Sequence, residues 1–103
     1  MEYLAHMIGA AFWVNGVPHF TQGVSGHRFQ SPFAKPPGVG LSSPVTNVVW
    51  GSLNFLVGYL LLFQVGEFVM GANLDAILTV ASGFLSACAI ARYFSRFYPA
   101  GGE

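Results

Sequence analysis

Long hydrophobic runs alternate with short polar breaks along this chain. Apolar residues dominate positions 3–20, 44–70 and 74–97, and the longest polar stretch lies between the first two runs, at 21–43. A helix needs about 20 apolar residues to cross the hydrocarbon core of a bilayer, and the first run only just reaches that length. The pattern therefore predicts an all-α membrane protein, a single domain with three transmembrane helices.

Local sequence signals support these limits. Ser43 followed by Pro44 is typical of the N-cap and first position of a helix, and Asn73 with Asp75 gives the third helix a similar start. Gly71 suits the left-handed conformation that often ends a helix. The connection between the second and third helices would then be so short that the two are predicted to form an antiparallel hairpin.

The polar stretch at 21–43 is rich in proline and glycine but also contains Phe29 and Phe33. Disordered linkers are usually poor in aromatic residues, whereas aromatic residues gather at membrane interfaces. Arg28 and Lys35 would reach lipid phosphates from such a position. We expect an ordered interfacial loop rather than a flexible tether.

Several short motifs in and around this loop resemble a group of small bacterial integral membrane proteins of unknown function. The motifs are Val17–Phe20, Phe29–Ala34, Pro36–Gly38, Leu41–Ser43 and Trp50–Gly51. The resemblance covers most of the chain and implies a bacterial origin, with the inner membrane as the expected location. It implies no activity, ligand or catalytic residue.

Composition agrees with a membrane location, because 53% of the residues are hydrophobic and only 8% are charged. Soluble domains carry about 25% charged residues. The four basic and four acidic residues give a formal net charge of zero, and there is no basic tract. Nucleic-acid binding is excluded on these grounds. Cys88 is the single cysteine and has no partner for an internal disulfide.

Candidate chemistry centres on the loop face, where four side chains are possible contacts for a headgroup or ligand: His19, His27, Arg28 and Lys35. A haem or metal site formed by His19 and His27 is a minor alternative to histidines that only make hydrogen bonds. The sequence lacks zinc-protease, paired-cysteine and nucleophile-elbow motifs. We therefore predict no catalytic or metal-binding residue, and an enzyme is the less favoured class.

The second helix carries a distinctive polar face. Its members recur at steps of four, three and four residues and are Asn47, Gly51, Asn54 and Gly58. Small residues allow close helix approach, and amides would be unpaired against lipid, so this face is predicted to pack against a helix or to line a pore. The third helix has a comparable strip at Thr79, Gly83, Ala87 and Ala91.

Three functions remain open. The leading hypothesis is a non-catalytic accessory or scaffold subunit, or a self-associating bundle, whose partners are lipids and another copy or another membrane protein. The second is a homo-oligomeric transporter or channel for a small neutral or amphipathic solute, with Asn47 and Asn54 lining its path. The third is a membrane enzyme or binding protein that acts on a lipid or cofactor at the loop face.

Charge predicts the orientation of the three spans. All four basic residues belong to the long loop or the C-terminal end, and the other side holds Glu2, Glu67 and Asp75. Under the positive-inside rule, the loop and C-terminus lie in the cytoplasm.

Overall fold

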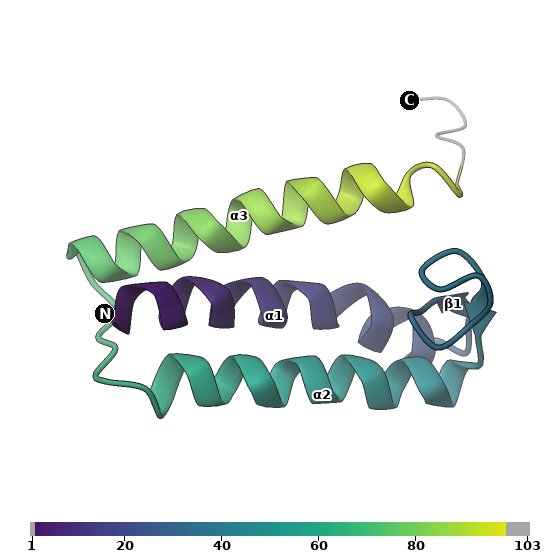
Figure 1. The fold of residues 1–103 in the computed structure, drawn as a ribbon, viewed down its shortest axis with the longest axis horizontal. Helices are drawn as coiled ribbons and strands as arrows, with labels where there is room; N and C mark the ends of the chain where they lie inside the picture. The colour runs from purple at the N-terminus through teal and green to yellow at the C-terminus, as the bar shows by residue number, and fades with distance from the viewer. Residues whose placement is uncertain (1, 99–103) are drawn as a thin grey trace.

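The computed structural model describes residues 2–98 and is mainly helical. Its elements in chain order are α1 (Glu2–Val24), β1 (Phe29–Gln30), β2 (Leu41–Ser42), α2 (Pro44–Phe63) and α3 (Leu74–Phe94). Helix α1 lies between α2 and α3 and packs against both (Figure 1). Helices α2 and α3 are long and apolar enough to cross a membrane, with mean hydropathies of 1.5 and 1.8.

Helix α2 ends at Phe63 rather than near Met70. The Gln64 amide donates to the Leu60 carbonyl, and Gly66 then takes a positive φ of 63°. Residues 64–73 form the connection, so Gly71 is not the terminator. The predicted hairpin of the second and third helices is not formed, because α1 lies between them (Figure 1).

The other helix limits differ less from the prediction. Helix α1 continues past position 20 to Val24, with Pro18 inside it. Proline removes one backbone donor, and packing against α2 continues beyond it, since Gly23 approaches Pro44. Helix α3 begins at Leu74, where the Asn73 side chain accepts a hydrogen bond from the Ala76 amide, and ends three residues before position 97.

Three close contacts hold α1 against α2. A Cβ added at Gly16 would lie 2.8 Å from the Gly51 carbonyl oxygen, and one added at Gly9 would lie 3.0 Å from the Gly58 carbonyl oxygen. The third contact joins Gly23 to the start of α2. From one contact to the next, the residue number increases by seven in α1 and decreases by seven in α2. The two helices therefore pack antiparallel. We call this contact the glycine seam.

Helix α3 is held less closely. A Cβ added at Gly83 would lie 3.7 Å from the Ala10 and Val14 side chains, which is an ordinary packing distance. The small-residue strip of α3 therefore meets α1 rather than α2. Figure 1 shows α3 inclining away from α1 towards its C-terminal end.

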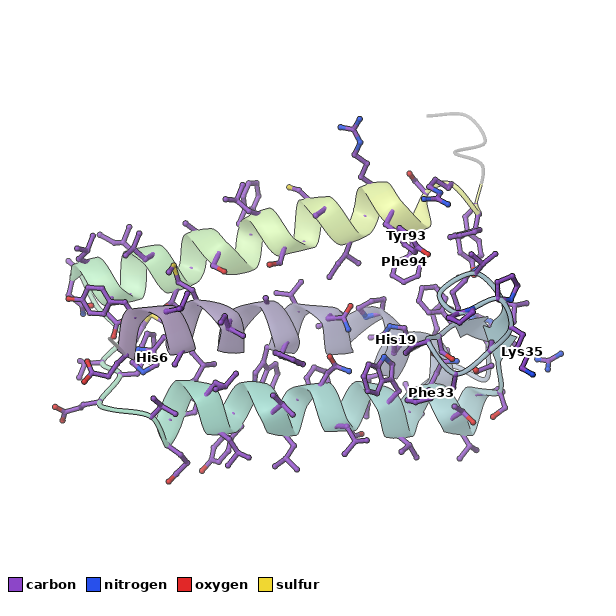
Figure 2. All side chains as sticks on the ribbon, in the orientation of Figure 1. His6, His19, Phe33, Lys35, Tyr93 and Phe94 are labelled. Atoms are coloured by element: carbon purple, nitrogen blue, oxygen red, sulfur yellow. The ribbon has the colours of Figure 1, made fainter. Side chains whose placement is uncertain are left out.

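Polar side chains lie inside this bundle and apolar side chains lie outside it. Among residues 2–98, the buried apolar side chains are Ala10, Phe29 and Ala76, whereas large hydrophobic side chains are exposed along every helix (Figure 2). The buried polar residues are His6, His19, Gln30, Ser31, Asn47, Asn54, Asp75 and Thr79. This distribution is the reverse of that in a water-soluble domain.

The 21–43 loop folds over one end of the bundle. Strands β1 and β2 pair antiparallel, with Phe29 opposite Ser42. Phe29 is buried against Phe94, with ring centroids 4.6 Å apart. The Tyr93 hydroxyl donates to the Gly38 carbonyl at 2.6 Å, so the end of α3 also holds the loop.

Candidate functional site

Two buried histidines mark the two ends of α1. His6 is fully buried, and its Nδ1 lies 2.8 Å from a carboxylate oxygen of Asp75 while its Nε2 lies 2.7 Å from the Val65 carbonyl oxygen. Both partners are acceptors, so both ring nitrogens donate, which describes an imidazolium paired with a carboxylate. His6 joins α1 to α3 and to the α2–α3 connection, and neither nitrogen is left for a ligand.

His19 is also buried but makes only one hydrogen bond. Its Nδ1 donates to Asn47 Oδ1 at 2.9 Å. The orientation of the amide is fixed, because Asn47 Nδ2 donates to the carbonyls of Phe29 and Ser43, each at 3.1 Å. The edge-to-face contacts with Phe29 and Phe94 hold the ring in place.

The second nitrogen of His19 makes no hydrogen bond within residues 2–98. Thr79 Oγ1 is the one fully enclosed side-chain atom without a hydrogen-bond partner within residues 2–98. Because His19 Nε2 also lacks a partner, it must keep some accessible surface. His19 lines a cavity of about 350 Å³ between α1, α3 and the loop. Apolar walls come from Trp50, Ile90 and Phe94. In Figure 2, Tyr93 and Phe94 project from α3 towards the side on which His19 lies.

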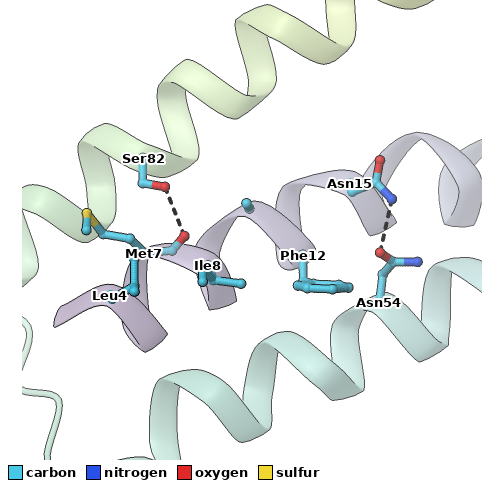
Figure 3. Close-up of a pocket in the computed structure, with 8 residues that line it drawn as sticks. Leu4, Met7, Ile8, Phe12, Asn15, Asn54 and Ser82 are labelled. Atoms are coloured by element: carbon cyan, nitrogen blue, oxygen red, sulfur yellow. Dashed lines mark hydrogen bonds between the residues drawn. The ribbon is translucent and has the colours of Figure 1, made fainter. Parts of the chain in front are cut away.

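A second cavity of about 490 Å³ shares one lining residue with the first. Its α1 wall contains Leu4, Ile8, Ala11 and Phe12, while Asn54 and Ser82 come from α2 and α3 (Figure 3). Asn15 lines both cavities and donates from Nδ2 to Asn54 Oδ1 at 3.0 Å. The two cavities are therefore neighbours at Asn15, and residues of α1, α2 and α3 line both. We call them together the lateral groove.

The lateral groove changes character along its length. The part near the N-terminus of α1 is lined mainly by apolar side chains together with Asn54 and Ser82, whereas the loop end holds His19 with Gln30 and Ser31. Of the residues that line the groove, none is an Asp, Glu, Lys or Arg. Its geometry suits an elongated molecule with an apolar body and an uncharged polar end.

The predicted polar face of the second helix lies against α1. Asn47, Gly51, Asn54 and Gly58 are the buried residues of α2, and both amides bond to side chains of α1. The glycines belong to the glycine seam. Only Asn54, among these four, lines the lateral groove.

The other predicted loop-face residues do not join His19. His27 is exposed and donates from Nδ1 to Gln22 Oε1 at 2.9 Å. Arg28 and Lys35 are also exposed, and none of the three lines the groove. Within residues 2–98, no group of three or more His, Cys, Asp or Glu side chains is placed to hold a metal ion.

Several groove residues were not singled out from the sequence, notably Asn15, Gln30 and Trp50. A signal existed for Asn15, because Leu4, Ile8, Asn15 and His19 follow helical spacing along one face of α1. Nothing comparable pointed to Gln30, which reaches the site only because the loop folds back. Comparison with protein-family models, curated proteins and solved structures found no match.

Proposed function

We propose that this chain is a small integral membrane protein with three spans whose lateral groove binds a membrane-dissolved amphipathic molecule. The observation that carries the proposal is a largely apolar groove whose loop end is lined by His19, a buried residue whose Nε2 has no hydrogen-bond partner within residues 2–98. Neither an accessory subunit nor a pore would require such a groove.

The position of α1 supports a third span. It lies between two helices that are each long enough to cross a bilayer. Its polar side chains His6, Asn15 and His19 all bond inward, while Val17 and Val24 are exposed. Bilayer hydrocarbon offers no hydrogen bonds, so a spanning helix must satisfy its polar groups internally.

The direction of the groove supports a ligand that arrives through the membrane. The α1 wall of the groove runs along the length of the bundle, with Asn54 of α2 and Ser82 of α3 on its two sides (Figure 3). From Leu4 to His19 it follows α1 for about 22 Å, at 1.5 Å per residue. A hydrocarbon tail would lie beside Leu4 and Ile8, with its polar end at His19.

Native mass spectrometry of the detergent-purified protein tests this role. The protein is incubated with four oleyl compounds: monoolein, methyl oleate, oleic acid and oleylamine. Replacing Ala11 by Trp fills the groove and should abolish retention of whichever compound wild type retains. Cys88→Trp is the matched control, because Cys88 is exposed and lines neither cavity. Equal retention by both variants and wild type would remove the groove as the binding site.

A second role, as a subunit of a larger membrane assembly, is favoured by the exposure of α3. Its buried residues are Asp75, Ala76 and Thr79, all within its first turns. Farther along, Phe84 and Leu85 are exposed by about two thirds. A partner helix on this side would appear as an additional protein mass in the same native spectra.

The orientation of the spans follows from charge. The 21–43 loop and the C-terminal end of α3 lie at one end of the bundle (Figure 1). This end carries the exposed basic residues Arg28, Lys35, Arg92 and Arg96. Under the positive-inside rule this charge supports our proposal that this end lies in the cytoplasm, in a protein of the bacterial inner membrane.

A further inference from the structure

We infer that the molecule held in the lateral groove has an uncharged head that carries a hydroxyl group, which donates a hydrogen bond to His19 Nε2. The inference rests on the proposed function and specifies the ligand class.

The hydrogen bond between His19 and Asn47 determines whether the other ring nitrogen, Nε2, is a donor or an acceptor. Asn47 Nδ2 already donates to backbone carbonyls, so its Oδ1 must be the atom that accepts from His19 Nδ1. Nδ1 therefore carries the proton, and in a neutral imidazole Nε2 is left with a lone pair. The His19 residue is only 3% exposed, so water has little access to this acceptor, and a donor from the ligand would satisfy it.

A hydrogen-bond donor lies in the same cavity. Gln30 is 4% exposed, and its Oε1 accepts from the Tyr98 hydroxyl at 2.9 Å. Within residues 2–98, the side-chain nitrogen Nε2 of Gln30 has no hydrogen-bond acceptor. It is not fully enclosed, so it keeps some accessible surface. The cavity thus presents an acceptor at His19 and a donor at Gln30. A hydroxyl beside an ester or ether oxygen would satisfy both.

The absence of charged side chains from the groove argues for a neutral head. A carboxylate or an ammonium group would lose its hydration in this cavity without meeting an opposite charge. A carboxylate could pair there only if His19 took up a second proton. The loop end of the groove is also where the bundle meets the polar interface, so the head would lie at the depth of lipid headgroups.

The four oleyl compounds separate these possibilities, because they share one chain and differ in the head. Monoolein should be retained about fivefold to tenfold better than methyl oleate, which has the ester but no hydroxyl; one net hydrogen bond accounts for a factor of that size. Oleic acid and oleylamine should be retained no better than methyl oleate. In wild-type protein labelled with ¹⁵N-histidine, monoolein alone should shift the His19 Nε2 signal.

Replacing His19 by Phe keeps an aromatic ring between Phe29 and Phe94 and removes the acceptor. This variant should retain monoolein only as well as methyl oleate, whereas His27→Phe should behave as wild type. Because His19→Phe also leaves Asn47 Oδ1 without its donor, the wild-type ¹⁵N measurement provides a test that does not depend on the variant.

Each alternative result has a definite meaning. Equal retention of monoolein and methyl oleate, with an unchanged His19 signal, would overturn the hydroxyl inference while leaving the groove as a binding site. Preferential retention of oleic acid or oleylamine would overturn the neutral head. Failure of wild type to retain any of the four would remove the proposed function together with this inference.

Discussion

His6 and His19 lie near opposite ends of α1 and differ in their hydrogen bonds. Both ring nitrogens of His6 donate hydrogen bonds, one to the Asp75 carboxylate and one to a backbone carbonyl. In His19, Nδ1 donates to the Asn47 side chain and Nε2 has no partner within residues 2–98. The first arrangement is a structural connection between elements. The second resembles that of a binding group, because one ring nitrogen is fixed by the protein and the other is free.

Replacing Asp75 by Asn should destabilise the fold. The variant leaves the His6 imidazolium without its counter-charge in a fully buried position, and loss of one partner of a buried pair costs about 3 kcal/mol or more. Unfolding by sodium dodecyl sulfate in mixed micelles measures the change in free energy. Glu67→Gln is the control, because Glu67 is an exposed carboxylate in the same connection. Equal stability of the two variants would show that the pair contributes little.

This pair was not predicted from the sequence. Asp75 was recognised only as an acidic residue near a helix start, and His6 lies 69 residues away. Their contact depends on α1 lying beside α3, which no local pattern specifies. By contrast, the capping role of Asn73 is local and agrees with the structure, in which Asn73 Oδ1 accepts from the Ala76 amide.

At the scale of elements, the glycine seam sets how closely α1 and α2 approach. Gly51→Ala should destabilise the protein by about 1 to 3 kcal/mol, because the added Cβ would lie 2.7 Å from the Phe20 amide nitrogen and backbone cannot move aside cheaply. Gly83→Ala is the matched substitution on α3, where the added methyl meets only ordinary contacts. It should be neutral or stabilising, since alanine favours helix.

The same micelle unfolding assay compares the two alanine variants. If Gly83→Ala proved as damaging as Gly51→Ala, the α1–α3 contact would be as close as the glycine seam.

A short hydrogen bond from Tyr93 helps to hold the loop to the end of α3, beside the packing of Phe29 on Phe94. Tyr93→Phe removes the donor to the Gly38 carbonyl, and a net loss of about 1 kcal/mol should raise the population of the opened loop about fivefold. Trypsin cleavage after Arg28, which adjoins strand β1, reports that opening. Tyr59→Phe is the control on an exposed tyrosine of α2. An unchanged cleavage rate in Tyr93→Phe would mean that other contacts hold the loop.

Helix positions were more predictable than helix partners. Hydrophobic runs and the Ser43–Pro44 start located α2 and α3 because these signals are local. The prediction that α2 packs directly against α3 missed the role of α1. The contact of α1 with α2 depends on a series of glycines seven residues apart in α1, and these meet three positions of α2: Gly58, Gly51 and Pro44. A short connection was taken as evidence of direct packing, but residues 64–73 allow α1 to lie between the two helices.

At the scale of the whole molecule, polar residues hold the bundle together and apolar residues cover it. Three side-chain contacts of α1 carry this organisation: His6 with Asp75, Asn15 with Asn54, and His19 with Asn47. In water, the exposed apolar surface would favour aggregation, whereas in lipid it is solvated. This distribution therefore requires α1 to lie inside the membrane with α2 and α3.

Thiol labelling in intact cells tests that claim directly. Single cysteines replace Glu2, Ser25 and Ala72 in a Cys88→Ser background, since all three positions are exposed at an end of the bundle. Three spans with the predicted orientation require an impermeant reagent to label positions 2 and 72 from outside, and position 25 only after permeabilisation. Labelling of positions 2 and 25 from the same side would show that α1 does not cross the membrane and would contradict the account.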